Sequence, residues 1–177
     1  IQLIRIDELA ENTVLKIQQQ VEALPFPPAL SARMEFDGYT ILRALHSSSR
    51  SHVYLAQDNQ SRKQVVIKAP AIDIKNDAEH LERFLMESWV ARRINNAHVL
   101  KADLAERPKR YIYTAFEFIE GQTLAQWAID NPQPELEIVR GLVEQLAKGL
   151  NALHKMDMLH QDIRPENIMI DNQGTVK

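Results

Sequence analysis

Short, mainly apolar runs separated by polar segments dominate the first half of the sequence. Three of them are YTILRAL (39–45), HVYLAQD (52–58) and QVVIKAP (64–70), and each contains β-branched or aromatic residues. The segments between them, SSSRS and NQSRK, consist of residues common in turns. This pattern predicts three consecutive strands that pair antiparallel as a meander.

A helix with a charged residue on its buried face is predicted next. Asp77 can cap its N-terminus. The residues predicted on one face are Phe84, Glu87, Ala91 and Ile94, at spacings of three, four and three. A lone carboxylate among apolar side chains is costly, so a cation is expected opposite Glu87. Lys68, in the strand sequence VVIK, is the candidate.

The second half predicts two more strands, at 98–104 and 110–118, and then two helices. The first helix is expected at 121–130 and the second at 135–154. The buried stripe predicted for the second helix consists of Leu136, Val139, Leu142, Val143, Leu146, Leu150 and Leu153.

Both ends of the sequence carry their own patterns. Residues 1–9 alternate as a strand would, and LPFPPAL (24–30) holds three prolines, which predicts a linker. A strand, a turn closed by Gly174 and the start of a second strand are expected over 167–177.

Composition narrows the class of protein. A chain of 177 residues with 45% apolar and 25% charged residues predicts one globular domain or part of one. The net charge of −3, without a basic stripe, argues against a nucleic-acid partner. The absence of cysteine excludes disulfides and Cys-ligated zinc, and cytoplasmic localisation is the default expectation. No apolar run approaches the roughly 20 residues of a membrane helix, so any membrane tether would lie in segments outside this chain.

The polar loop HQDIRPEN (160–167) carries the strongest chemical signal. It places Asp162 five residues before Asn167. An acid and an amide at this spacing put a proton acceptor and a metal ligand on one loop.

Over residues 36–177 the sequence resembles the eukaryotic-type protein kinases. VVIK resembles the strand-3 lysine motif of the family, and Glu87 lies 19 positions after Lys68 (87 − 68 = 19), where the helix-C glutamate is expected. FEFIEGQTL (116–124) resembles the hinge. HQDIRPENIMI resembles the catalytic loop of protein kinases rather than that of small-molecule phosphotransferases.

The resemblance implies an α+β, protein-kinase-like fold. An antiparallel five-stranded N-lobe sheet with helix C is expected over 36–118, including the hinge. The first helices and the catalytic loop of an incomplete C-lobe, ending before the DFG motif, are expected over 119–177. Residues 1–35 would then be the end of a preceding domain, comprising a strand, a helix and the Pro-rich linker. This junction resembles the one in bacterial proteins that join a metal-dependent protein phosphatase to a kinase-like domain.

The resemblance also implies roles for the chemically active residues. Lys68 would hold the α- and β-phosphates of ATP, with Glu87 fixing its ammonium. Asp162 would accept or orient the proton of the substrate hydroxyl, Asn167 would bind Mg²⁺, and Arg164 would contact the γ-phosphate. The residues expected around ATP are Leu45, His46, Ser47, Ser48, Ser49, Arg50, Ser51, Val53, Val66, Lys68, Phe116, Glu117, Ile119 and Met169.

Two departures from the family pattern affect this expectation. His46, Ser48 and Ser51 replace the three glycines of the phosphate-binding loop, which predicts a stiffer loop and weaker ATP binding. Gln161 replaces the arginine that commonly precedes the catalytic aspartate, which argues against control by phosphorylation of the activation loop.

The sequence therefore predicts a Ser/Thr protein kinase that transfers the γ-phosphoryl group of Mg-ATP to a protein hydroxyl. These 177 residues alone are expected to be inactive, because the DFG aspartate of the family is not among them. The alternative from another class is a pseudokinase, a nucleotide-sensing module that regulates a fused phosphatase. A small-molecule kinase of similar fold is disfavoured by the sequence RPEN.

Overall fold

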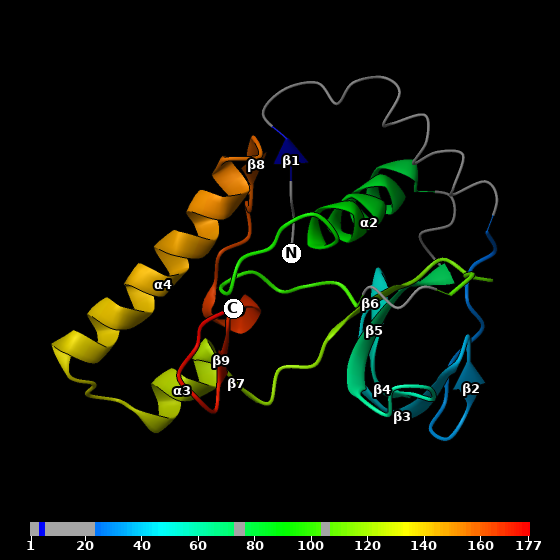
Figure 1. Cartoon of the computed structure of the whole chain (residues 1–177), viewed down its shortest axis with the longest axis horizontal. Helices are drawn as coiled ribbons and strands as arrows, with labels where there is room; N and C mark the ends of the chain where they lie inside the picture. The colour runs from blue at the N-terminus through cyan, green and yellow to red at the C-terminus, as the bar shows by residue number, and fades with distance from the viewer. Residues whose placement is uncertain (1–3, 6–23, 73–76, 104–106) are drawn as a thin grey trace. The chain divides into compact units, whose positions relative to one another are not determined.

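The computed structural model describes residues 4–5, 24–72, 77–103 and 107–177. These residues form two compact units, which Figure 1 shows together. The sheet unit comprises the described residues from 24 to 92 together with 101–103 and 107–118. The loop unit comprises residues 4–5, 93–100 and 119–177.

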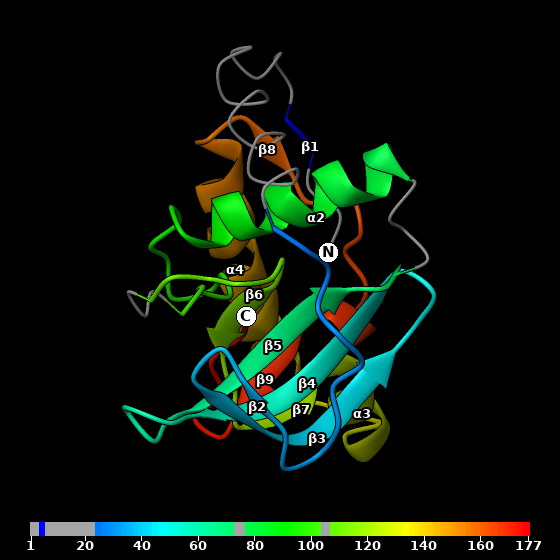
Figure 2. The same cartoon turned by 90° about the vertical axis from the view of Figure 1, so that its right-hand side faces the viewer.

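The sheet unit contains a five-stranded antiparallel sheet, seen face-on in Figure 2. The strands in spatial order are β2 (Glu35–Phe36), β3 (Tyr39–Ser47), β4 (Ser51–Asp58), β5 (Gln64–Pro70) and β6 (Thr114–Glu117). The predicted meander of three strands is confirmed in β3, β4 and β5. The five-stranded antiparallel sheet of the predicted α+β fold is confirmed as well.

The outer parts of the sheet differ from the prediction. Over its described residues, 98–103, the predicted strand 98–104 is replaced by a loop with an isolated bridge between Ala102 and Phe116. The predicted strand 110–118 shrinks to the four residues of β6, and the fifth strand is instead the short β2. Ala102 is buried, which is why its segment resembles a strand in the sequence. Its burial comes instead from a loop that lies against β6.

One face of the sheet carries the core of this unit. Val65, Ile67 and Ala69 alternate along β5 and are at most 4% exposed. They pack with Tyr54 and Ala56 of β4 in a single apolar cluster. Because side chains alternate between the two faces of a strand, the residues between these positions belong to the opposite face.

Helix α2 (Ala78–Ala91) begins at the predicted cap, since the Asp77 carboxylate accepts a hydrogen bond of 3.1 Å from His80 N–H. Phe84 is buried, as the apolar spacing predicts. The helix ends at Ala91, so Ile94 lies beyond it and not on its face, contrary to the prediction.

The loop unit contains two helices and several short strands. In chain order its elements are β1 (Ile4–Arg5), β7 (Gly121–Thr123), α3 (Leu124–Asp130), α4 (Leu136–His154), β8 (Met158–Leu159), the 3₁₀ helix η2 (Pro165–Asn167) and β9 (Met169–Asp171). β1 pairs with β8 and β7 pairs with β9, both antiparallel. The turn after β9 is closed by Gly174 at φ +79°, as predicted.

The predicted helix 121–130 is wrong over its first three residues, which form β7. A side chain at Gly121 would place Cβ 2.0 Å from Ile170 O, so the close pairing of β7 with β9 requires glycine. The helix begins only at Leu124, after the Thr123 hydroxyl accepts a hydrogen bond from Gln126 N–H.

The buried stripe predicted for α4 is only partly correct. Leu142 and Leu153 are buried, whereas Leu136 is 69% and Val143 is 58% exposed. Leu142 packs with a cluster built from the end of the chain. The members of that cluster are Ile168, Ile170 and Val176, with Leu124, Trp127 and Leu146 against it. Among the described residues, no helix is both long and apolar enough to cross a bilayer.

Candidate active site

Four of the residues expected around ATP share one face of the sheet. Val53 pairs with Lys68 across β4 and β5, and Val66 pairs with Phe116 across β5 and β6. Directly paired residues project from the same face, and this face is opposite to the one that carries the core. The structure therefore brings Val53, Val66, Lys68 and Phe116 together on the face away from the core.

Lys68 is joined to Glu87 across this unit. Its Nζ lies 2.5 Å from Glu87 Oε2, and the two side chains are 21% and 13% exposed. The pair connects β5 to α2, so a charged group of the helix orients a charged group of the sheet. An ammonium held this way presents a positive charge at the same face as Val53 and Val66.

The turn between β3 and β4, where the phosphate loop is expected, is closed by its own hydrogen bonds. The Ser48 hydroxyl accepts from Ser51 N–H at 3.1 Å and from Arg50 N–H at 3.3 Å, and it also lies 3.1 Å from Ser51 O. Ser48 N–H donates to Ser51 O at 3.0 Å. The Ser47 hydroxyl lies 2.8 Å from His52 Nδ1. Three backbone N–H groups that could face a phosphate are therefore already bonded within the turn.

The other predicted residues of this loop lie where β3 is irregular. The register of β3 with β4 shifts between Ala44 and His46, and Leu45 is 38% exposed. Ser49 and Arg50 are exposed at the tip of the turn. The stretch from Leu45 to Ser51 thus forms the end of one hairpin, as the sequence pattern indicates.

At the hinge, one backbone group is already engaged. Glu117 N–H donates to Lys101 O at 3.0 Å, and Lys101 N–H donates to Glu117 Oε1 at 2.9 Å. Glu117 N–H is therefore not available to an adenine in this geometry. Phe116 and Glu117 belong to the sheet unit, whereas Ile119 and Met169 belong to the loop unit.

In the loop unit, Asp162, Arg164 and Asn167 come together. Asn167 Nδ2 donates to Asp162 Oδ2 at 2.8 Å and to Asp162 O at 3.0 Å. Arg164 Nε lies 3.4 Å from Asp162 Oδ1. The turn η2, with Pro165 at its start, brings position 167 back toward position 162. One carboxylate is thus held by an amide and flanked by a guanidinium.

The backbone before Asp162 is unusual. Gln161 has φ of +57°, in the left-handed region that residues other than glycine rarely adopt. Asp162 N–H donates to His160 O at 2.8 Å across this turn. Burial lowers the pKa of His160, and the negative charge of Asp162 opposes that shift. His160 is therefore favoured in its neutral form beside the carboxylate.

Two residues were missed from the sequence on the face away from the core, here called the ATP-side face because it carries four of the residues expected around ATP. Leu55 pairs with Val66, and Thr114 pairs with Lys68, so both share the face with the predicted residues. Thr114 is 2% exposed, and its Oγ1 has no hydrogen-bond partner among the described residues. The signal was available, because Leu55 lies two positions after Val53 and Thr114 two positions before Phe116.

The residues present suit a single Mg²⁺ ligand contributed by Asn167. Its Nδ2 is used by Asp162, which leaves the carbonyl oxygen Oδ1, a hard ligand of the kind Mg²⁺ prefers, as the coordinating atom. Among the described residues, no group of three or more His, Cys, Asp or Glu side chains could hold a metal ion. This donor set fits an ion held mainly by substrate phosphates.

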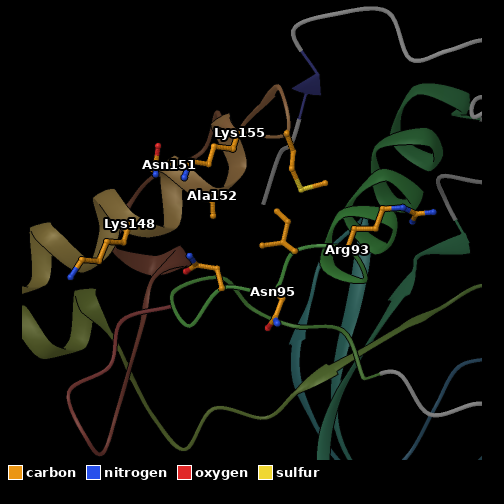
Figure 3. Close-up of a pocket in the computed structure, with 9 residues that line it drawn as sticks. Arg93, Asn95, Lys148, Asn151, Ala152 and Lys155 are labelled. Carbon is orange, nitrogen blue, oxygen red and sulfur yellow. The ribbon is translucent and has the colours of Figure 1, made fainter.

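A groove of about 260 Å³ in the loop unit contains none of the predicted site residues. Lys148, Asn151, Ala152 and Lys155 line it from α4, opposite the loop that carries Arg93 and Asn95 (Figure 3). None of the residues that line the groove belongs to the loop 160–167.

Curated relatives of this chain are bacterial kinases. The chain is 31% identical over 140 residues to Serine/threonine-protein kinase PrkC of Bacillus subtilis, covering 78% of this chain and 22% of that protein. It is 30% identical over 158 residues to Serine/threonine-protein kinase PknL of Mycobacterium bovis, covering 89% of this chain and 39% of that protein. The chain thus spans well under half the length of either relative.

Solved structures agree with these relatives. The PknI kinase domain of Mycobacterium tuberculosis matches with a TM-score of 0.68 and 27% identity, covering 82% of this chain and 59% of that chain. The apo form of PpkA-294 matches with a TM-score of 0.70 and 20% identity, covering 84% and 59%, and supports the fold alone. The protein kinase domain model matches residues 39–177, which include both the Lys68–Glu87 pair and the Asp162–Asn167 loop. This chain therefore belongs to the protein kinase domain family.

Proposed function

We propose that this chain supplies the ATP-binding and catalytic-loop parts of a Ser/Thr protein kinase, which transfers the γ-phosphoryl group of Mg-ATP to a protein hydroxyl. The observation that carries the proposal is the 2.5 Å ion pair between Lys68 and Glu87. The relatives named as serine/threonine-protein kinases support the substrate class.

On the sheet, the proposed role of Lys68 is to bind nucleotide phosphates. Its ammonium lies on the same face as Val53 and Val66, whose apolar side chains suit an adenine ring. Glu87 holds the ammonium in one position, so the cation needs no reorganisation when phosphate charge develops. A lysine of this kind contributes positioning and electrostatic stabilisation rather than covalent chemistry.

On the loop, the proposed role of Asp162 is to accept or orient the proton of the substrate hydroxyl. The hydrogen bond from Asn167 Nδ2 at 2.8 Å and the nearby Arg164 Nε hold its carboxylate in one orientation. Arg164, whose side chain is 60% exposed, is proposed to contact the γ-phosphate. Mg²⁺, when bound at Asn167, supplies neutralisation of phosphate charge.

The experiment is transfer of labelled γ-phosphate to a generic basic protein by the full-length protein. Lys68→Met and Asp162→Asn are each expected to reduce transfer by at least about 100-fold, the scale of losing a charge that acts in the transition state. Lys63→Met and Asp130→Asn are matched controls, since both positions are exposed and lie outside the predicted site. Transfer that persists in both site variants would refute the assignment.

The division of the chain is also part of the proposal. Residues 36–118 are assigned to the N-lobe and hinge, 119–177 to the start of the C-lobe, and 1–35 to the end of a preceding domain. The chain covers about 60% of the solved kinase-domain chains (59% and 61%). We expect the 177-residue polypeptide alone to transfer no phosphate, since the family uses a further aspartate to bind metal. Transfer by this polypeptide would contradict that expectation.

A second candidate is a nucleotide-sensing pseudokinase module. The observation that favours it is the closed serine turn, in which Ser48, Arg50 and Ser51 N–H groups are already bonded. Full-length protein that binds ATP but transfers no phosphate, to itself or to another protein, would support this candidate over the kinase.

A fused metal-dependent phosphatase is proposed on the sequence pattern of the first 35 residues. The described part of residues 1–9 is the strand β1 at Ile4–Arg5. Hydrolysis of p-nitrophenyl phosphate by the full-length protein in the presence of Mn²⁺, and its loss on adding EDTA, is the expected result. Absence of metal-dependent hydrolysis would remove this part of the proposal.

A further inference from the structure

We infer that the Ser48 hydroxyl acts as an internal competitor of nucleotide phosphate and thereby lowers the affinity of the site for phosphorylated nucleotides. The inference rests on the proposed function, because it assigns nucleotide phosphates to the turn between β3 and β4. It adds a specificity-determining residue, one that separates the binding of ATP and ADP from that of adenosine.

The backbone N–H groups of the turn between β3 and β4 already have a hydrogen-bond acceptor inside the protein, the Ser48 hydroxyl. Ser48 Oγ accepts from both Arg50 N–H and Ser51 N–H, and Ser48 N–H donates to Ser51 O. Ala71 N–H donates to Arg50 O at 3.0 Å, which ties the turn to the end of β5. The turn is therefore held on two sides, by a side chain within it and by a neighbouring strand.

A phosphate oxygen needs the same donors that this hydroxyl occupies. Backbone N–H groups of a loop bind phosphate only when they point at it without another acceptor. For a phosphate to bind Arg50 or Ser51 N–H, the bond to Ser48 Oγ must first break, and each exchanged bond reduces the net gain. A glycine at this position has no side-chain oxygen that could compete with phosphate for these N–H groups.

Of the three residues that replace the loop glycines, Ser48 is the one whose side chain accepts hydrogen bonds from backbone N–H groups of the turn. His46 and Ser51 occupy the other two positions, and the bonds to Arg50 and Ser51 N–H come from Ser48 alone. The effect is therefore assigned to one oxygen atom and can be removed by one substitution.

The test compares three variants of the full-length protein by isothermal titration with Mg-ATP, Mg-ADP and adenosine. Ser48→Ala removes the oxygen and keeps Cβ, while Ser48→Gly also restores backbone freedom. Ser61→Ala is the matched control, because the Ser61 hydroxyl likewise accepts from an N–H two residues on, that of Lys63 at 3.4 Å, in the turn between β4 and β5.

We expect Ser48→Ala to lower the Kd for ATP and ADP about threefold to tenfold, as for removal of one or two competing hydrogen bonds. Ser48→Gly should lower it by at least as much, and adenosine affinity should change less than about twofold because adenosine has no phosphate to compete. Ser61→Ala should leave all three affinities unchanged.

Other outcomes overturn the inference in distinct ways. Weaker ATP binding by Ser48→Ala would show that the hydroxyl itself binds phosphate, and an unchanged Kd would show that the bonds do not compete. An equal gain for adenosine would place the effect on the adenine pocket. Absence of binding of ATP and adenosine in every protein would overturn the proposed function together with the inference.

Discussion

At the scale of single residues, the hydrogen-bond partners of partly and fully buried polar groups matter most for this molecule. Lys68 and Glu87 satisfy each other, and Asp162 is held by Asn167. Thr114 differs, because its hydroxyl is buried without a partner among the described residues. The energetic consequences of these three cases can be separated by substitution.

Thr114→Val is expected to raise the free energy of unfolding by about 1 kcal/mol, because an unpaired buried hydroxyl is replaced by a methyl group of similar size. Thr40→Val is the matched control. The Thr40 hydroxyl donates to Asn59 Oδ1 at 2.6 Å, so its loss should lower stability. Urea denaturation followed by circular dichroism measures both. A destabilised Thr114→Val variant would indicate that the hydroxyl has a polar partner in solution.

Lys109 is expected to make stability depend on pH in the alkaline range. Burial lowers its pKa from 10.5 to about 8, with a smaller effect from the charge of Arg92. Between pH 8 and pH 10.5, Lys109 is protonated in more of the unfolded chains than of the folded ones. The free energy of unfolding should therefore rise as the pH increases from 8 toward 10. Below pH 8 this group adds no pH dependence of its own.

The comparison with Lys109→Met isolates that contribution. The variant should lack the rise in unfolding free energy between pH 8 and 9.5 that the lowered pKa of Lys109 predicts. Denaturation series at several pH values measure the difference between the two proteins. Parallel pH profiles for wild type and variant would show that Lys109 keeps an ordinary pKa.

At the scale of elements, two glycines of α4 have opposite surroundings. A Cβ added at Gly149 would lie 2.6 Å from His98 O, whereas one added at Gly141 would meet no atom within 4 Å. Gly149 lies where the helix packs closely on the 95–98 loop, and Gly141 lies on an open part of the same helix.

Gly141→Ala is therefore expected to stabilise the protein by roughly 0.5–1 kcal/mol, through the better helix propensity of alanine. Gly149→Ala should destabilise it by about 2 kcal/mol, because backbone must move to admit the methyl group. Thermal unfolding of the two single variants tests both signs. Equal effects of the two substitutions would contradict the close packing at Gly149.

At the scale of the whole molecule, α4 carries large apolar side chains that the described residues leave exposed. Leu136 is 69%, Ile138 is 49% and Val143 is 58% exposed. Large apolar side chains gathered on one exposed helix favour association. We expect the 177-residue polypeptide to self-associate as its concentration rises.

Val143→Glu should weaken that association, because it places a charge on the helix face that Val143 shares with Leu136, seven positions earlier. Gln133→Glu is the control, since it adds the same charge at an exposed position before the helix. Sedimentation velocity over a range of concentrations measures the change. A monomer at every concentration, or an equal effect of both variants, would count against the apolar surface of α4 as the cause.

The chemistry-bearing positions could be predicted from the sequence because they depend on local spacing. Lys68 and Glu87 were paired from one carboxylate on an apolar helix face, and the loop of Asp162 and Asn167 was identified from their separation by five positions (167 − 162 = 5). The strands β3, β4 and β5 and the cap of α2 by Asp77 are likewise local properties, set by alternation and by side-chain hydrogen bonding.

Other features were decided only by tertiary structure, because they depend on contacts between distant segments. Gly121–Thr123 is a strand because β9, some 50 positions later, pairs with it. The described residues 98–103 lie in a loop despite the apolar residues among them. The burial of Thr114 on the ATP-side face follows from its pairing with Lys68. The sequence by itself determined which residues are the candidates for the chemistry, because their types and spacing are local. Tertiary packing decided which of their neighbours are buried, exposed or already bonded, because those contacts join distant segments.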